Sequence, residues 1–441
     1  MTQNEFLRLC VYGGRDEIEE ALISGADVSE PGYINGAEVP PVFVAVMEEN
    51  AEAVKVLIEN GANPGDGIMA AIVRGKKKLL KLLVDCGADV NRPDNQHRTP
   101  LLFAVTSNNP KVLKWLIEFG ADVNMKTETG YSALTFTLLM HDNPEGNYRK
   151  FNPGIVSELM KAGADYGEAM MLAVKTGSRE FIDLLLKNGA DINRPCDGVQ
   201  SPLAAALFMG KEEIDSGMVD FLVSYGANVN EIIPLGDGTL TTPLNVSITM
   251  ERPDIESLFL FSDANPNFRD PTGRTALVYA VMTGVEFVKL LLEYNADPDI
   301  PDNDGRTPLM LAALDVGTEP EILETLIHYG ANVNAQDKDG MTALIWTVAG
   351  RDRTPGFLMS SLVRTGGLRA EGWESWFLLA VSYIAMKREA QLNSIKLLVE
   401  HGADVNLADK NGMTPLMCAM MNYDDEVIEI LTKSGKKKKE E

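Results

Sequence analysis

The stretch Gly402-Ala403-Asp404-Val405-Asn406 decides the fold, because this phrase or a close variant occurs eleven times in the 441-residue chain. Most copies are about thirty-odd residues apart, and a period of that size indicates a stack of similar supersecondary units. The other copies begin at Gly25, Gly61, Gly87, Gly120, Gly163, Gly189, Gly226, Asp263, Asn295 and Gly330.

Each copy of the phrase marks the end of a helix. A helix that stops and reverses places its next residue in the left-handed conformation, which glycine adopts without a steric penalty. Asp263 and Asn295, which replace the glycine in two copies, belong to the few residue types that tolerate this conformation. Apolar residues at helical spacing precede the copies, as in Val112, Leu113 and Leu116. We therefore expect positive φ at the first residue of every copy.

A second short pattern, Thr-Pro-Leu or a relative, follows most copies and opens another helix, as at Thr99, Thr307 and Thr414. Thr is a good N-cap, and Pro suits the first helical position. One repeat therefore contains a turn, a helix opened by Thr-Pro, a short link, a second helix and the exit phrase. With its Asp-x-x-Gly-x-Thr-Pro-Leu starts at 302–309 and 409–416, this unit resembles the ankyrin repeat.

The resemblance covers nearly the whole chain and implies an all-α fold, an α-solenoid with β-hairpin fingers on one side. Counting a degraded copy at Gly366, we expect about thirteen ankyrin-like helix-turn-helix repeats of about 34 residues, some without a finger. A single solenoid domain is predicted over residues 1–433. Its terminal cap repeats are expected at 1–28 and 406–433, and a charged tail at 434–441.

The spacing of the phrase also predicts where repeats are irregular. The intervals Gly61 to Gly87 and Gly163 to Gly189 are shorter than the others by the length of a hairpin, so both repeats are predicted to lack a finger. Such a gap is either the loss of a surface loop or a notch that shapes a binding site. A third fingerless repeat is expected at 372–380. Insertions, which are either decorations or a second contact surface, are expected at 141–153, 211–217, 317–320 and 351–356.

Charge and cysteine usage restrict the partners. The formal net charge of −24 disfavours binding to nucleic acid or anionic membranes and favours a protein partner with basic patches. The four cysteines are far apart in sequence, which is typical of a reducing compartment. Residues 4–14 lack the basic and apolar segments of a secretory signal. We therefore expect a cytoplasmic protein.

No catalytic, metal or cofactor motif is found in the sequence. The tract Asp302-Asn303-Asp304-Gly305 resembles part of a calcium loop. Its first and twelfth ligand positions would be Ile300 and Leu311, however, which cannot bind the ion. The four histidines do not share a metal-ligand spacing. The sequence predicts no cofactor, no metal and no enzyme activity.

The end of the first helix is the best candidate for a binding surface, because the resemblance places it on the inner face of the stack. Apolar residues occupy this place in the middle of the chain, where a solvated face would be polar; they either pack between repeats or form an adaptable binding stripe. These residues are Leu139, Met140, Phe208, Met209, Met250, Met282 and Leu314. Finger residues complete the candidate site: Gln96, Arg98, Tyr131, Arg274, Arg306 and Met341.

Two functions are consistent with these features. The first is a monomeric, non-enzymatic interaction scaffold that binds one protein partner along its concave face and fingers. The alternative is a neutralising inhibitor or immunity-type regulator, which would cover a basic active site with its acidic surface.

Overall fold

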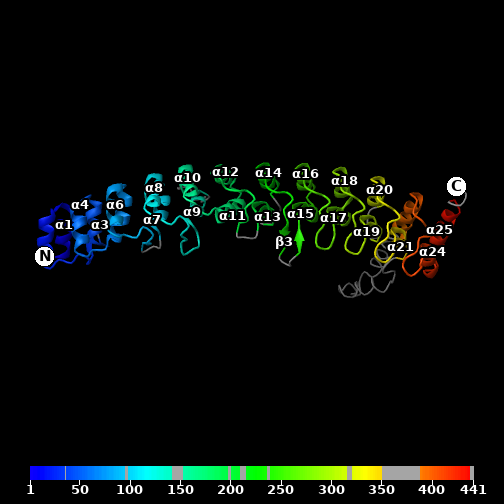
Figure 1. Ribbon diagram of the computed structural model, residues 1–441, viewed down its shortest axis with the longest axis horizontal. Helices are drawn as coiled ribbons and strands as arrows, with labels where there is room; N and C mark the ends of the chain where they lie inside the picture. The colour runs from blue at the N-terminus through cyan, green and yellow to red at the C-terminus, as the bar shows by residue number, and fades with distance from the viewer. Residues whose placement is uncertain are drawn as a thin grey trace, which may run out of the picture. The chain divides into compact units, whose positions relative to one another are not determined.

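The computed structural model describes residues 1–34, 36–94, 98–141, 152–196, 200–208, 215–235, 239–314, 320–349 and 388–437. The chain divides into two compact blocks, an N-terminal block Met1–Met209 and a C-terminal block Gly210–Glu441. In each block, short helices alternate as the first and second helix of successive repeats (Figure 1).

The N-terminal block contains seven first helices and six second helices in its described part. The first helices are α1 (Gln3–Tyr12), α3 (Pro41–Met47), α5 (Ile68–Arg74), α7 (Pro100–Thr106), α9 (Ala133–His141), α11 (Gly167–Thr176) and α13 (Pro202–Phe208). The second helices are α2 (Arg15–Ile23), α4 (Ala51–Glu59), α6 (Lys77–Asp85), α8 (Pro110–Glu118), α10 (Pro153–Lys161) and α12 (Arg179–Lys187). A 3₁₀ helix, η1 (Pro64–Gly67), precedes α5.

The C-terminal block contains five first helices and six second helices among its described residues. The first helices are α15 (Pro243–Thr249), α17 (Ala276–Thr283), α19 (Pro308–Leu314), α21 (Ala343–Ala349) and α24 (Pro415–Met421). The second helices are α14 (Ser216–Ser224), α16 (Pro253–Phe261), α18 (Val285–Glu293), α20 (Pro320–His328), a helix over 388–400, and α25 (Asp425–Lys437). The expected all-α solenoid is therefore confirmed.

Packing runs in series within each block. First helices contact the first helices of neighbouring repeats, from α1 to α13 in the N-terminal block and from α15 to α24 in the C-terminal block. Second helices do the same, for example α14 with α16 and α16 with α18. Phe6, Phe181 and Phe259 are among the fully buried side chains between them. The core is thus continuous along each series, as expected of a repeat protein.

The exit phrase has the predicted backbone conformation. The nine glycines have φ between 84° and 95°, and Asp263 and Asn295 have φ of 64° and 63°. The prediction of positive φ at all eleven exits is confirmed. The helix starts also agree, because the hydroxyls of Thr99, Thr242 and Thr414 each accept a hydrogen bond from the backbone N–H three residues later.

The last Asn of the phrase links consecutive repeats. The side chain of Asn124 donates to the carbonyl of Gly163 over 3.3 Å and accepts from the N–H of Asp165 over 2.7 Å. The same pair of hydrogen bonds is made by Asn91, Asn230, Asn267 and Asn334. The recurrence of this residue in the sequence therefore has a physical cause, because it provides one donor and one acceptor to the next exit.

Two of the fingers are short antiparallel hairpins. They consist of β1 (Gly32–Ile34) with β2 (Ala37–Val39), and β3 (Ile233–Pro234) with β4 (Leu240–Thr241). Four other fingers are tight turns organised by one carboxylate, which accepts from the backbone N–H groups two and four residues later. These carboxylates belong to Asp270, Asp302, Asp337 and Asp409.

The two short intervals contain no hairpin in the structure. Only η1 lies between the exit at Gly61 and α5, and α11 begins four residues after Gly163. Arg194 of the next exit forms an ion pair with Asp165 over 3.2 Å. Arg92 lies 3.9 Å from Asp66 in the other short interval. An Asn-Arg-Pro exit follows each short interval and nowhere else in the chain, so this arginine replaces part of the missing finger contacts.

The repeat with exit Gly330 lies directly against the repeat with exit Gly402. The side chain of Asn334 donates to the carbonyl of Gly402 and accepts from the N–H of Asp404. The N–H of Lys410 donates to the carbonyl of Asp339 over 2.9 Å. The expected degraded copy at Gly366, and with it the fingerless repeat at 372–380, lies outside the described residues. Residues 350–387 connect two helices of a single repeat, α21 and 388–400.

Candidate functional site

One residue at the end of each first helix forms a series that we name the first-helix row. Its members occupy the same place in the repeat, two residues before the residue that links the two helices. Because the first helices pack against one another in order, neighbouring members lie side by side. In the N-terminal block they are Val11, Met47, Val73, Thr106, Leu139, Lys175 and Phe208, and in the C-terminal block Thr249, Met282, Leu314, Ala349 and Met421.

The predicted stripe residues differ in their exposure. Met282 is 73% exposed, and Met250, which follows Thr249, is 51% exposed. These two side chains therefore do not fill the space between repeats. Leu139, Met140, Phe208 and Leu314 are half-buried, which means that part of each side chain packs against a neighbouring helix. Met209 lies outside the described residues.

The row continues beyond the residues that the sequence pattern indicated. Val73 is 57% exposed and Met421 is 69% exposed, and Met47 is half-buried. Counting from Thr-Pro-Leu misses Met47 and Val73, because their repeats lack that start. Counting backward from the link to the second helix would have found both of them. Met417 and Met420, 48% and 57% exposed, extend the apolar surface on α24.

The finger arginines are engaged within the protein. The guanidinium of Arg98 donates to the carboxylate of Asp94 over 2.8 and 3.0 Å, and it lies 5.4 Å from the ring centre of Phe103. Arg306 lies 5.5 Å from the ring centre of Trp346 and 3.2 Å from the carboxylate of Asp304. Both side chains are therefore held in place, and a partner would have to displace these contacts to use them.

The other finger residues are held mainly through the backbone. The N–H groups of Arg274 and Met341 donate to the finger carboxylates of Asp270 and Asp337 over 2.9 and 2.8 Å. Both side chains are half-buried. Gln96 lies outside the described residues.

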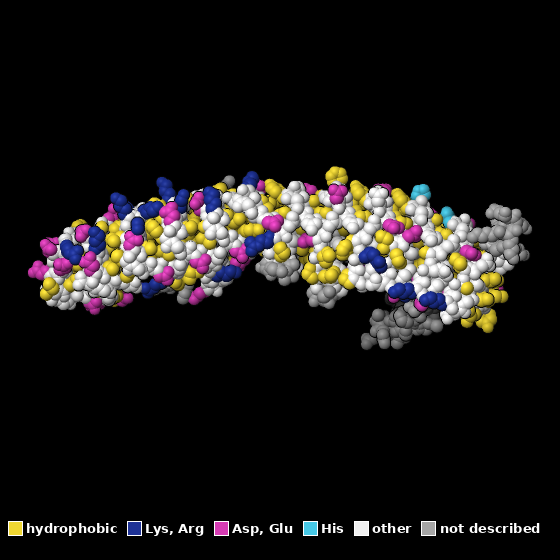
Figure 2. Space-filling view, in the orientation of Figure 1, with side chains coloured by type: hydrophobic (Ala, Val, Ile, Leu, Met, Phe, Trp, Pro, Cys, Tyr) yellow, Lys and Arg dark blue, Asp and Glu magenta, His cyan; other side chains and the backbone are white. Residues whose placement is uncertain are grey.

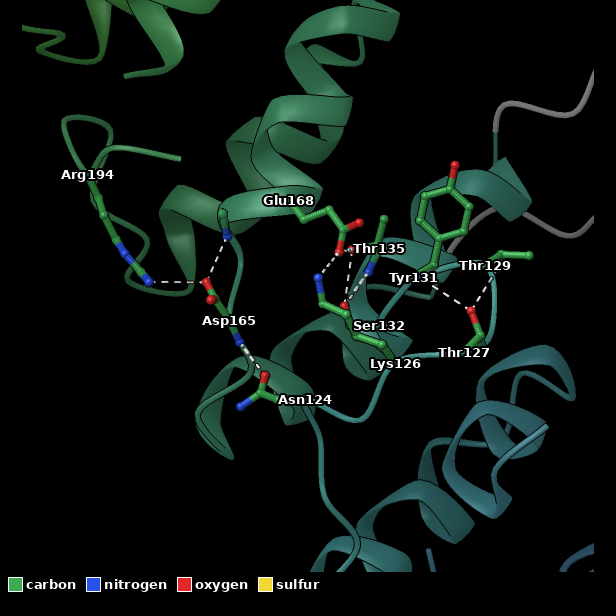
Figure 3. A network of polar contacts seen from close by, with 11 residues as sticks. Asn124, Lys126, Thr127, Thr129, Tyr131, Ser132, Thr135, Asp165, Glu168 and Arg194 are labelled. Atoms are coloured by element: carbon green, nitrogen blue, oxygen red, sulfur yellow. Dashed lines mark hydrogen bonds and ion pairs between the residues drawn. The ribbon is translucent and has the colours of Figure 1, made fainter. Parts of the chain in front are cut away.

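Tyr131 belongs to a polar network that joins two repeats (Figure 3). Its N–H donates to the hydroxyl of Thr127 over 3.2 Å, and its side chain is half-buried. Close by, Lys126 lies 3.3 Å from the carboxylate of Glu168. The hydroxyl of Thr135 also contacts this carboxylate, over 3.5 Å. The network holds the backbone of the finger.

The electrostatics of the fingers favour ionised carboxylates. Burial raises the pKa of Asp270, but hydrogen bonds from Thr272 and Tyr279 outweigh it and hold the pKa below its usual value. Burial and the hydrogen bond to Asp270 together raise the pKa of Tyr279 to about 12. The N–H of Met413 is the main cause that lowers the pKa of Asp409. The carboxyl groups of Asp270 and Asp409 are therefore ionised at neutral pH.

The described residues contain neither a candidate metal site nor a candidate membrane span. No group of three or more His, Cys, Asp or Glu side chains there could hold a metal ion. None of the described helices combines the length and the apolar character that crossing a membrane requires. The row carries three exposed large apolar side chains among these residues, those of Val73, Met282 and Met421.

Comparisons with known proteins agree with the repeat pattern. A family model described as ankyrin repeats (3 copies) matches residues 42–127, 148–233, 244–337 and 376–441. An ankyrin repeat protein of Acanthamoeba polyphaga mimivirus is 30% identical over 27% of this chain and 37% of its own length. The human transient receptor potential cation channel subfamily A member 1 is 26% identical over 98% of this chain. The alignment covers 39% of the channel, so the chain spans well under half of either relative.

A solved structure, the ankyrin repeat domain of Bcl-3, shares 26% identity with the chain. The match covers 60% of this chain and 97% of the Bcl-3 chain, with a TM-score of 0.44.

Proposed function

The chain belongs to the ankyrin repeat family, whose model matches most of it, and we propose that it is a non-enzymatic scaffold that holds one protein partner along the first-helix row. Ankyrin repeats mediate protein–protein interactions, and the family is generally non-enzymatic. The single observation that carries the proposal is the exposure of Met282, a member of the row, at 73%, and of Met250, next to the row member Thr249, at 51%. Large apolar side chains in series on a surface are typical of an interaction site.

The partner is expected to combine apolar side chains with basic patches. Methionine is flexible and polarizable, so a row of exposed methionines adapts to side chains of different shape. The chain carries a net charge of −24, which accelerates association with a basic surface. The half-buried Tyr131 is expected to add an aromatic contact from a finger of the N-terminal block. Arg98 and Arg306 stabilise their fingers and contribute less to the partner.

We also propose that the chain is monomeric and lies in the cytoplasm. It is expected to bind protein and neither nucleic acid nor membranes. The support is compositional: all four cysteines are free, which suits a reducing compartment, and the strong negative charge repels anionic polymers and lipids. The neutralising inhibitor is a special case of the same contact, in which the partner is an enzyme with a basic active site. Stoichiometric loss of the captured partner's activity on mixing would identify that case.

The test is affinity capture with the full chain, followed by mass spectrometry. A variant with Met250→Glu and Met282→Glu is expected to lose its partner, because two buried carboxylates in an apolar contact cost more than the contact gains. The matched control, Ser257→Glu with Thr432→Glu, adds the same charge to exposed sites on second helices and is expected to retain the partner. If both variants capture the same protein as the parent, with unchanged circular dichroism, the row is not the binding surface.

A further inference from the structure

Four aromatic side chains stand on consecutive second helices of the C-terminal block, on a surface that the first-helix row does not include. Tyr225, Tyr294 and Tyr329 directly precede the exits of their repeats, and Phe261 lies one residue earlier in its repeat. Their exposed fractions are 44%, 38%, 41% and 80% in that order. We call these four residues the aromatic ridge. Figure 2 shows hydrophobic side chains along the corresponding edge of this block, above α14 to α18.

Among the described repeats, exposed aromatic residues follow one another at the ends of the second helices only in this part of the chain. At the position of the three tyrosines, the N-terminal block carries Asn60, Cys86, Asn188 and one aromatic residue, the half-buried Phe119. At the position of Phe261, most repeats carry charged or polar residues such as Glu59 and Glu118, with the exposed Ile23 as the exception. Single exposed aromatics are ordinary on a protein surface. Four of them on helices that pack in order, α14 to α20, form a surface instead.

The rings at both ends of the ridge are held in position by neighbours. Tyr225 lies 4.9 Å from the ring centre of Phe221 in a tilted arrangement. Tyr329 meets His328 edge to face at 5.5 Å. Because these rings already have fixed neighbours, the protein loses little side-chain entropy when a ligand packs against them.

The second helices that carry the ridge are acidic, and three of their exposed carboxylates, those of Asp220, Glu293 and Glu324, lie within five residues of a ridge aromatic. The only lysine on α14, α16, α18 and α20 is Lys289, which already pairs with Glu321. The exposed carboxylates on these four helices belong to Asp220, Asp254, Glu286, Glu293, Glu321 and Glu324. A ligand of this surface should therefore carry positive charge.

We propose that the aromatic ridge binds a basic, proline-rich segment in the polyproline II conformation. Packed helices lie about 8–10 Å apart, so neighbouring aromatic residues of the ridge are separated by about that distance. A polyproline II helix advances about 9 Å in one turn of three residues, and prolines pack well against aromatic rings. One turn of the ligand thus matches one repeat of the protein. An arginine or lysine at every third position of the ligand then reaches the carboxylates beside the ridge.

The experiment measures fluorescence anisotropy of labelled peptides with the full chain. A probe of Pro-Pro-Arg triplets is expected to bind about tenfold more tightly than a Gly-Gly-Arg probe of equal length and charge, because the glycine chain must lose more entropy. Phe261→Ser combined with Tyr294→Ser is expected to weaken the proline probe by about tenfold or more. Phe261→Ser alone, at a site 80% exposed, should show most of this loss without affecting folding.

Ile23→Ser is the matched control. Ile23 is 88% exposed and occupies the position of Phe261 in the first repeat, away from the ridge, so this variant should bind the proline probe like the parent. Met250→Glu with Met282→Glu should also retain the probe, which separates this surface from the first-helix row. Equal affinity for the two probes, or an unchanged affinity in both ridge variants, would overturn the proposal. So would a basic amphipathic helical peptide of equal charge that binds the parent more tightly than the proline probe does and loses affinity in the Phe261→Ser variant.

Discussion

Glu256 is the residue that departs most from its place in the repeat. It lies on α16 seven residues before the exit, where other second helices carry the fully buried Val54, Leu113 and Val288. Glu256 is fully buried too, and neither carboxylate oxygen has a hydrogen-bond partner among the described residues. Burial, assisted by the negative charge of Glu286, raises the pKa of Glu256 to about 8. The folded protein therefore holds this carboxyl group protonated at neutral pH.

The raised pKa makes stability dependent on pH in a definite direction. Between its ordinary value of 4.5 and about 8, Glu256 keeps a proton in the folded state and loses it on unfolding. Its contribution is thus most favourable below pH 4.5 and is lost as the pH rises toward 8. Glu256→Leu is expected to raise the free energy of unfolding by about 1–3 kcal/mol at pH 8, and by less at pH 5.

Denaturant unfolding of the parent and the variant at several pH values tests this effect. The contributions of the other titrating groups cancel in the difference between the two free energies of unfolding. Glu256→Gln is the control, because it removes the ionisation and keeps an unpaired polar group. It should flatten the pH dependence without the full gain in stability. If the free energies of unfolding of the parent and of Glu256→Leu change in parallel between pH 5 and 8, Glu256 does not titrate in this range.

Tyr423 shows strain of a different kind. It links α24 to α25 with a φ of 53°, and its side chain is 90% exposed, so the ring gains little from packing. A non-glycine residue in the left-handed region costs about 1 kcal/mol or more. Tyr423→Gly is therefore expected to raise the midpoint of thermal unfolding. Tyr12→Gly, at an equally exposed site at the end of α1, should lower the midpoint instead, because Tyr12 has helical geometry.

At the scale of elements, the repeats are joined by a few directed hydrogen bonds in addition to the apolar core. The bridging asparagines supply two such bonds at a junction, as Asn124 does. At the start of the fingerless repeat that contains α11, Gly167 stands at the position of this Asn, and the preceding residue, Tyr166, supplies the acceptor instead. The Tyr166 hydroxyl accepts from the N–H of Asp191 over 3.0 Å, and the Arg194 guanidinium lies 4.8 Å from the centre of its ring. One aromatic side chain thus replaces both the bridge and part of the finger.

Tyr166→Phe tests this replacement. Loss of the hydroxyl leaves the N–H of Asp191 without its acceptor, and we expect a loss of about 1 kcal/mol of stability. Hydrogen exchange of that N–H should accelerate. Tyr131→Phe is the control, because no hydrogen bond of the Tyr131 hydroxyl is found among the described residues. Equal effects of the two substitutions would show that the Tyr166 hydroxyl does not join the repeats.

At the scale of the whole molecule, the described elements on both sides of residues 350–387 contact one another directly. The side chain of Gln391 donates to the carbonyl of Thr347 over 2.7 Å, and that of Asn422 donates to the carbonyl of Val348 over 3.1 Å. Together with the bond between Lys410 and Asp339, these contacts join the flanking elements without any repeat between them.

Replacing 350–387 with a short Gly–Ser link of about six residues should therefore leave the protein folded. We expect the helical circular dichroism signal per residue and the midpoint of unfolding to stay close to those of the parent. Deleting 308–330, which removes α19 and α20, is the control and should cause a large loss of stability, because it removes a repeat from the core. A similar loss on replacing 350–387 would mean that the two flanking repeats depend on that segment.

The sequence by itself determined the backbone of every exit. Positive φ at Gly25 through Gly402, and at Asp263 and Asn295, follows from local sterics, so the phrase predicted it without knowledge of any neighbour. The helix starts were predictable because Thr-Pro is a local capping pattern. The missing fingers were predictable because the intervals between their exits are short. The first-helix row was found only in part, since it was counted from Thr-Pro-Leu, which some repeats lack.

Only the tertiary structure decided what lies next to what. The direct contact of the Gly330 and Gly402 repeats depends on bonds between residues about seventy positions apart, and local patterns do not encode such distances. The exposure of Met282, the isolation of Glu256 and the alignment of the aromatic ridge are likewise properties of neighbouring helices. The conformation of one residue depends on its own sterics, whereas its burial depends on what packs against it.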